Sequence, residues 1–551
     1  MRETPERVAC ALGARRIGNR SMTDHNAHNA AAPEGKPSEP GRIYINEVQG
    51  HQARYRKLVQ FTSSSTKAAG AMLLGAIVAL IVANTAASGP FAEFWHTEVG
   101  FIFGDSHATL SLSHIINDVF MAVFFLLVGL EIKYEMTVGE LTNIRQAILP
   151  IVAAVGGVLA PIAIYAALNA GNPETAGGWG VPTATDIAFA LGILALLGNR
   201  VPNGVRVFLS TLAVADDIIA ILVIAVFYGQ SPSLFWLACA AVVFCVLLLM
   251  NKSHVYSLYA YLLVGAVLWY CVFMSGVHST IAGVLLAFTI PSGSRVNLKS
   301  FVRWSDQKVS EAKSSFDAQA PVIGQEEYLE TVSSLSRVAK QVVPPATRLE
   351  HLLYPWVYFG ILPLFALTNA NVSLVGTDLS SLIANPALLG VFFGLVVGKP
   401  LGIVAASFIV VKFKVANLPE NVNWMHMVGA AILGGVGFTM SIFVANLAYA
   451  DATTIAAAKL GILAASLVAG VAGFAFLALQ AKSARSQGVA YMSIGPSEMR
   501  RQTAGEEANA ASEKLLSEIS DPEVIRGVER ALAGCDGIAE VAVKVGEREE
   551  K

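Results

Sequence analysis

Long apolar runs recur along most of this chain, and they constrain its fold more than any other feature. A membrane-spanning helix needs about 20 mostly apolar residues. Charged residues make up 14% of the 551 residues, against about 25% in soluble domains. The sequence therefore predicts an all-α polytopic membrane protein, embedded in a lipid bilayer, with about twelve transmembrane helices. The predicted helices cover residues 66–88, 111–131, 148–169, 182–198, 204–228, 233–250, 256–275, 277–291, 354–374, 382–411, 424–448 and 454–481.

Connections that carry Lys or Arg alternate with connections that carry neither. Lys133 and Arg145 follow the second predicted helix, whereas residues 170–181 contain no basic residue. Basic connections lie on the cytoplasmic side of a membrane. The pattern therefore predicts a multi-pass protein with both termini in the cytoplasm. Lys459 is the exception, because it lies inside the last predicted helix.

The regions outside the two blocks of helices are polar. Residues 1–64 are predicted to form a disordered cytoplasmic tail, and they lack the early apolar core of a secretory signal. Helices one to eight fill residues 65–291, and helices nine to twelve fill residues 354–481. Residues 292–353 read as a cytoplasmic insertion with helix near 325–342, and residues 482–551 as a charged cytoplasmic tail.

Several classes of protein are disfavoured. No basic stripe suggests nucleic-acid binding, and the five cysteines form no CxxC pair, so neither a metal site nor a disulfide framework is indicated.

The outer connection at 89–110, which contains Gly and aromatic residues, fits either a small hairpin used for contact or a simple surface loop.

Three places put ionisable side chains inside the apolar segments, where each is costly and therefore a functional candidate. The stretch VPTATDIAFALG contains Asp186 after Pro182, Thr183 and Thr185. Pro removes a backbone donor, and Thr can cap a restarted helix. The stretch therefore predicts a helix interrupted within the membrane. An ordinary helix cap at the membrane surface is the alternative.

The other two places are LAVADDII, with Asp216 and Asp217, and GLVVGKPLG, with Lys399. Adjacent helical residues point about 100° apart. One aspartate can therefore ligate an ion while the other finds a different partner. Lys399 lies too far from either end of its segment to reach the membrane surface readily, so a buried carboxylate is its expected partner.

A second interruption is predicted at LGGVGFTMS, where Gly434, Gly435 and Gly437 weaken the eleventh helix. Paired interruptions in corresponding helices of two repeats point to a transporter site. Close helix packing would also account for these glycines.

In several long motifs that follow one another in the same order, the chain resembles the NhaA family of Na⁺/H⁺ antiporters. The similar motifs are INDVFMAVFFLLVGLEIKYE (116–135), TATDIAFALGIL (183–194), LAVADDIIAI (212–221), SGVHSTIAGV (275–284), RLEHLLYPWV (348–357), ILPLFALTNA (361–370), GKPLGI (398–403) and GVGFTMSIF (435–443). The resemblance covers roughly residues 66–481. The insertion and the long C-terminal tail depart from the family pattern.

The resemblance implies two inverted repeats with two discontinuous, crossing helices. It implies that Asp186 and Asp217 bind Na⁺ or Li⁺ as metal ligands, with Thr185 beside the crossing. It further implies that Asp216 pairs with Lys399 and takes part in proton exchange.

For pH sensing, the resemblance singles out charged residues near the cytoplasmic entrance, and His278 near the outer end of the eighth helix is a further candidate. Each could instead be a surface charge, and His278 a core histidine. The entrance candidates are Glu131, Lys133, Glu135, Glu350 and His351.

The expected function is that of a transporter, not an enzyme, in the bacterial inner membrane. It would exchange intracellular Na⁺ or Li⁺ for external H⁺ without a cofactor, with pH regulation, net charge movement and a homodimeric state implied by the resemblance. A sodium-coupled organic solute symporter is the main alternative. An intramembrane aspartyl protease lacks its GxGD sequence here and leaves Lys399 unexplained, and a cation channel lacks an obvious symmetric filter.

Overall fold

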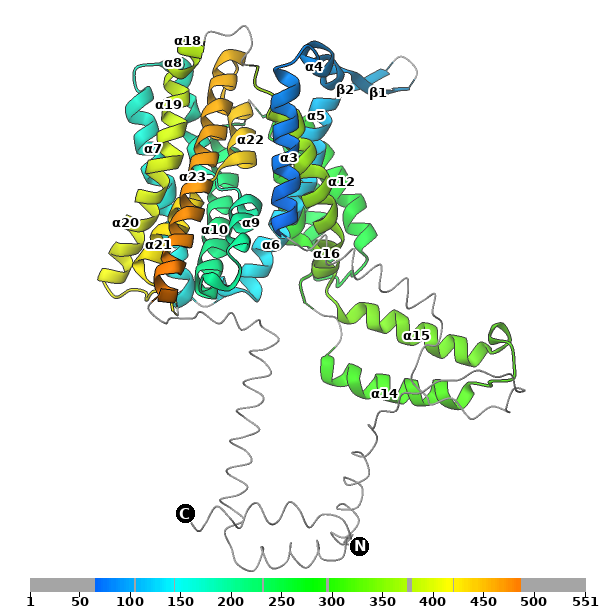
Figure 1. The fold of residues 1–551 in the computed structure, drawn as a ribbon. Helices are drawn as coiled ribbons and strands as arrows, with labels where there is room; N and C mark the ends of the chain where they lie inside the picture. Colours follow the sequence, from blue (N-terminus) through cyan, green and yellow to red (C-terminus); the bar gives the residue numbers. More distant parts are fainter. Residues whose placement is uncertain are drawn as a thin grey trace, which may run out of the picture. The chain divides into compact units, whose positions relative to one another are not determined.

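The computed structural model describes residues 65–103, 106–142, 144–229, 232–293, 297–373, 379–419 and 421–486. The predictions for the N-terminal tail, and for the C-terminal tail beyond residue 486, lie outside these residues. The described chain is nearly all helical, and its long helices run side by side in a bundle (Figure 1). The predicted all-α fold class is therefore confirmed.

The long apolar helices match the predicted segments. In the described residues, eight helices are long and apolar enough to cross a membrane, or ten if each of two bent helix pairs is one span. The shorter apolar helices α12 (Leu258–Met274) and α13 (Thr280–Thr289) occupy the remaining predicted segments. The count of twelve spans therefore stays a prediction.

The eight single spans are built from α3 (Ser65–Ala83); α5 (Leu112–His114), η2 (Ile115–Phe120) and α6 (Met121–Thr137); α7 (Ile144–Asn169); α10 (Asn203–Phe227); α11 (Leu234–Lys252); α16 (Pro345–Trp356), η7 (Val357–Ile361) and α17 (Leu362–Asn369); α19 (Pro386–Phe393), η8 (Gly394–Gly398) and α20 (Lys399–Lys412); and α23 (Ala452–Ser486). The bent pairs are α8 (Pro173–Ala176) and η4 (Gly177–Thr183) with α9 (Ile187–Leu196), and α21 (Trp424–Gly434) with α22 (Phe438–Ala448). The segments η2, η7 and η8 are π-helical, and η8 ends directly before Lys399.

Some predicted bounds are wrong. Residues 170–181 were expected to be an outer connection, but Pro173–Thr183 forms the first half of a bent pair. This stretch is rich in Gly and polar residues, so its low hydropathy did not mark it as part of a membrane helix. Glycine is required there, because a Cβ on Gly178 would lie 1.8 Å from Tyr449 Oη. The ninth helix begins at Pro345 rather than 354, and the first ends at Ala83 rather than 88.

The connections carry the remaining elements. The connection at 89–110 contains α4 (Ser88–His96) and an antiparallel hairpin of β1 (Glu98–Phe103) and β2 (Ser106–Ser111), and its use for contact stays a prediction. The insertion contains α14 (Leu298–Ser315), η6 (Val322–Gly324) and α15 (Glu326–Val342), and α14 and α15 contact each other. Short helices η3 (Glu140–Thr142), η5 (Gly198–Arg200) and α18 (Leu379–Ile383) complete the described fold.

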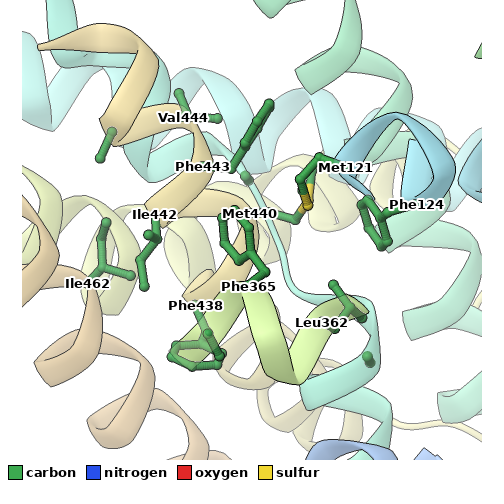
Figure 2. Packing of buried hydrophobic residues seen from close by; sticks show 14 of the residues in the cluster. Met121, Phe124, Leu362, Phe365, Phe438, Met440, Ile442, Phe443, Val444 and Ile462 are labelled. Atoms are coloured by element: carbon green, nitrogen blue, oxygen red, sulfur yellow. The ribbon is translucent and has the colours of Figure 1, made fainter. Parts of the chain in front are cut away.

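Close packing holds the bundle together. Figure 2 shows Phe443 of α22 among Met121, Phe365 and other buried apolar side chains, and its ring lies 6.3 Å from that of Phe365. Lipid tails are as apolar as these side chains, so complementary packing rather than the hydrophobic effect stabilises such contacts in a bilayer.

Helices α7 and α20 approach most closely through small residues. A Cβ on Gly156 would lie 2.4 Å from the Gly402 carbonyl oxygen, and a Cβ on Gly402 would lie 2.0 Å from that of Gly156. Only glycine allows the two backbones to meet in this way. This contact fixes α20, and with it Lys399 at its first turn, against the bundle.

Candidate ion-binding site

Two bent helix pairs meet at their breaks. The first bends by 46° between Thr183 and Ile187, and the second by 45° between Gly434 and Phe438. The backbone N–H of Asp186 donates to the Val436 carbonyl oxygen over 2.7 Å, which joins the two breaks. Both predicted interruptions are present, and this hydrogen bond pairs one backbone group from each break where the irregular backbone is buried in protein.

Asp186 is the N-cap of α9 and also binds the first turn of α22. Its Oδ1 accepts from the Phe189 N–H over 2.9 Å. Its Oδ2 accepts from the N–H and the hydroxyl of Thr439, at 3.1 and 2.5 Å. The carboxylate thus complements the positive ends of two helix dipoles at once. With only 2% of its surface exposed, Asp186 is a structural link between the breaks as well as a candidate ligand.

Asp216 and Lys399 form a fully buried ion pair, with Lys399 Nζ 2.6 Å from Asp216 Oδ2. The hydroxyl of Thr185 lies 2.5 Å from the same carboxylate oxygen and 3.0 Å from the Gly434 carbonyl oxygen. Lys399 also donates to the Thr183 carbonyl oxygen at the end of η4. The pair is therefore tied to both breaks.

Asp217 differs from the other two aspartates because its carboxylate forms no hydrogen bond or ion pair with another described residue; its Oδ1, like that of Asp216, is buried without a protein partner. Its side chain is 2% exposed, and it lies within electrostatic reach of Asp186, Asp216 and Lys399. Three carboxylates and one ammonium leave a surplus of negative charge in a low-dielectric setting, which attracts a small cation or protons. Asp217 is the carboxylate best placed to bind either.

The residues predicted to sense pH fall into separate groups. Glu131 of α6 accepts a hydrogen bond from the hydroxyl of Tyr358 in η7 over 3.3 Å. Glu350 of α16 lies within electrostatic reach of both Glu131 and His351, and Glu135 within reach of Glu131. These four ionisable groups therefore form one acidic cluster around the contact between α6 and α16.

Lys133 and His278 have other surroundings. Lys133 donates to the carbonyl oxygens of Phe288, at 2.8 Å, and Ile290, so it caps the carboxyl end of α13. The Nε2 of His278 lies 2.6 Å from the Tyr228 carbonyl oxygen, just before the start of α13. The length of α13 therefore separates His278 from the acidic cluster, in agreement with its predicted position near the other end.

Thr439 and Tyr358, the partners of Asp186 and Glu131, were not among the predicted site residues. A signal for Thr439 was available, because its hydroxyl lies two residues after the last glycine of the break in LGGVGFTMS. Tyr358 carried no such signal. Within the described residues, no group of three or more His, Cys, Asp or Glu side chains is arranged to hold a metal ion.

Comparison with known proteins decides the family. The sequence profile of the family described as Na⁺/H⁺ antiporter 1 matches residues 59–477. This chain belongs to the Na⁺/H⁺ antiporter 1 family. The match contains both bent helix pairs and every candidate residue above.

Individual members of the antiporter family are also similar over most of their length. The Na⁺/H⁺ antiporter NhaA of Wolinella succinogenes is 41% identical over 428 residues, covering 77% of this chain and 93% of the relative. The NhaA proteins of Helicobacter acinonychis and Oleidesulfovibrio alaskensis are each 44% identical, over 417 and 423 residues, covering 75% and 77% of this chain and 93% of each relative. The predicted NhaA-like fold thus agrees with the family.

Proposed function

We propose that this protein exchanges intracellular Na⁺ or Li⁺ for external H⁺ in a bacterial inner membrane, driven by the proton gradient. The observation that carries the proposal is the buried set of Asp186, Asp216, Asp217 and Lys399 at the two joined helix breaks. Membership of an antiporter family supports the same reading. The tails and the insertion, which ends where α16 begins at Pro345, lie in the cytoplasm, and the protein acts as a homodimer.

The mechanism is competition for one site. Asp217, with an oxygen that no protein group occupies, binds either the cation or a proton. Asp216 exchanges its partner Lys399 for a proton during the cycle. When the site opens outward, protons displace Na⁺, and when it opens inward, Na⁺ displaces protons. Rocking of one helix bundle against the other changes the side of access.

Two further properties complete the proposal. More than one proton leaves the site for each Na⁺, so the exchange moves net charge. The acidic cluster of Glu131, Glu135, Glu350 and His351 adjusts activity to cytoplasmic pH, because its protonation changes the charge at the contact between α6 and α16.

The test uses everted membrane vesicles from a bacterial strain that lacks its own antiporters. Wild type is expected to collapse a preformed ΔpH when Na⁺ or Li⁺ is added, and Asp217→Asn is expected to lose this response. Asp451→Asn, at an exposed position just before α23, is the matched control and should respond as wild type does. Strong exchange by Asp217→Asn would overturn the site. A silent wild type with substrate-dependent Na⁺ uptake would favour the symporter.

A further inference from the structure

The membrane helices pack in two groups. In the first, which we call the site bundle, α7 contacts α10, α19, α20 and η4, and α23 contacts α19, α21 and α22. In the second, the supporting bundle, α6 contacts α13 and α16, α12 contacts α11 and α13, and α17 contacts α3. The site bundle contains both bent pairs and therefore the candidate ion site. Rocking of one bundle against the other has to occur where these two groups meet.

Apolar side chains make up much of this meeting surface. Figure 2 shows Met440 and Phe443 of α22, in the site bundle, beside Phe365 of α17, in the supporting bundle. The ring of Phe443 also lies 5.6 Å from that of Phe125 in α6. Individual contacts of this kind are weak. The two bundles can therefore slide by exchanging one set of apolar contacts for another.

A chain of three asparagines crosses the same surface. Asn446 Nδ2, on α22, donates to Asn369 Oδ1, on α17, over 2.8 Å. Asn369 Nδ2 donates in turn to Asn117 Oδ1 of η2 over 2.8 Å and to the Phe365 carbonyl oxygen over 3.1 Å. The first hydrogen bond joins the two bundles, whereas the other two stay within the supporting bundle. Asn369, with 4% of its surface exposed, is thus the point where α22 is tied to the opposite bundle.

A second polar link joins the bundles at the end of α10. His278 precedes α13 in the supporting bundle, and its Nε2 donates to the carbonyl oxygen of Tyr228, the C-cap of α10 in the site bundle, over 2.6 Å. The Tyr228 hydroxyl donates to the Gly177 carbonyl oxygen over 2.9 Å and accepts from the Gly180 N–H over 3.0 Å. This link therefore reaches η4, the first half of the first bent pair.

Both links lie near connections that carry no Lys or Arg. Tyr228 is next to the connection at 229–232, and Asn446 is close to the one at 449–453, so the charge pattern predicts that both links are on the outer side. Hydrogen bonds have a strict geometry and weaken steeply when the groups move apart. The two links therefore favour one relative position of the bundles, with the outer ends tied together.

We propose that these two links form an outer latch, which holds the site open toward the cytoplasm and breaks when the site opens outward. This inference rests on the proposed exchange function. Asn446 and Asn369 are then positioning residues: they do not touch the ion, but they set the fraction of the protein that faces each side. Loss of a latch bond should shift this population toward the outward-open state.

The first test uses Asn446→Leu, which removes the donor and keeps a side chain of similar size. The half-maximal Na⁺ concentration is measured for the cytoplasmic face in everted vesicles and for the outer face in right-side-out vesicles. The apparent affinity of each face scales with the fraction of protein that opens to it. The ratio of the cytoplasmic to the outer half-maximal concentration should therefore rise about threefold, as expected for one interhelical hydrogen bond in a membrane. A general loss of stability would leave this ratio unchanged.

Asn251→Leu is the matched control. The Asn251 side chain of α11 donates to the Thr289 carbonyl oxygen at the end of α13, so its hydrogen bond stays within the supporting bundle. Its ratio should equal that of wild type. An unchanged ratio in Asn446→Leu, or an equal rise in Asn251→Leu, would overturn the latch.

Crosslinking gives a second test that does not depend on how well leucine is tolerated. With the native cysteines replaced by serine, Asn369→Cys with Asn446→Cys can be joined across the bundles, and Asn369→Cys with Asn117→Cys within the supporting bundle. A short bis-methanethiosulfonate reagent should abolish exchange in the first pair only, and dithiothreitol should restore it. Equal inhibition of both pairs, or full exchange by the crosslinked first pair, would contradict the proposal. A wild type without Na⁺- or Li⁺-driven exchange would instead reject the exchange function itself.

Discussion

The backbone N–H of Asp186 donates to the carbonyl oxygen of Val436 over 2.7 Å, so each helix break completes the other. Neither broken helix can shift alone without exposing a polar backbone group in the membrane, which costs several kcal/mol. The two bent pairs should therefore move as one body. Side chains that strengthen this link should control both stability and exchange.

The first prediction concerns Thr439. Thr439→Val removes the hydroxyl that donates to Asp186 Oδ2 over 2.5 Å and keeps the shape of the side chain. The free energy of unfolding should fall by about 1–3 kcal/mol, because a buried carboxylate loses a donor. Thermal unfolding in detergent measures this. Thr289→Val is the control, since its hydroxyl donates only to the Leu286 carbonyl oxygen at the far end of α13. An equal loss in the free energy of unfolding for Thr439→Val and Thr289→Val would show that the hydrogen bond to Asp186 adds no more stability than an ordinary one.

The second prediction concerns the ion pair of Asp216 and Lys399. Removing one partner leaves an uncompensated buried charge and costs about 3–5 kcal/mol. Lys399→Ala and Asp216→Ala should each lower the melting temperature strongly, and the double variant should recover part of the loss. Lys399→Ala should also change the pH dependence of exchange. Additive losses in the double variant, or an unchanged pH profile in Lys399→Ala, would contradict this reading.

Much of the site could be predicted from the sequence because its signals are local. An aspartate or lysine inside an apolar segment is visible without a structure, as Asp217 and Lys399 illustrate. The interruption at Pro182–Thr185 and the one at Gly434–Gly437 also carry local signals, and both are present as bends. The roles of these residues in ion exchange stay proposals.

The partners of these residues could not be predicted in the same way. Asp186 and Thr439 are 253 residues apart, and only packing brings them together. The first half of the first bent pair was missed because its glycines pack against Tyr449 and Tyr228, which are far away in the sequence. The resemblance grouped Lys133 with Glu131, whereas in the structure the two side chains have different partners, because two residues along a helix point to different neighbours.

The third prediction follows from that difference. Lys133→Met removes the donor to the last carbonyl oxygens of α13, so the melting temperature should fall while the pH at half-maximal exchange stays constant. Glu131→Gln should instead move the pH at half-maximal exchange, because it removes a charge from the acidic cluster. Lys412→Met is the control, since Lys412, in the last turn of α20, lies over the exposed ring of Phe408. A shifted pH profile in Lys133→Met would return Lys133 to the pH-sensing group.

The last prediction concerns Asp451, which lies outside the membrane spans and precedes α23. Its Oδ2 accepts from the Thr453 hydroxyl, and from the N–H and hydroxyl of Thr454 at 2.8 and 2.9 Å. These hydrogen bonds, that of Thr453 first, lower the pKa of Asp451 below its ordinary value. A carboxylate whose pKa is lower in the folded than in the unfolded protein stabilises the fold above its unfolded pKa, about 4, and loses this effect as the pH falls through its folded pKa.

Asp451→Ala should therefore lower the melting temperature at pH 7, and the gap to wild type should narrow below about pH 4. Asp451→Asn keeps a capping oxygen without the titrating proton, so it should retain part of the stability at pH 7 with a weaker pH dependence. Melting curves of the three proteins in detergent, from neutral to acidic pH, measure both effects. A constant gap between wild type and Asp451→Ala across this range would mean that the ionised carboxylate adds nothing to the cap of α23.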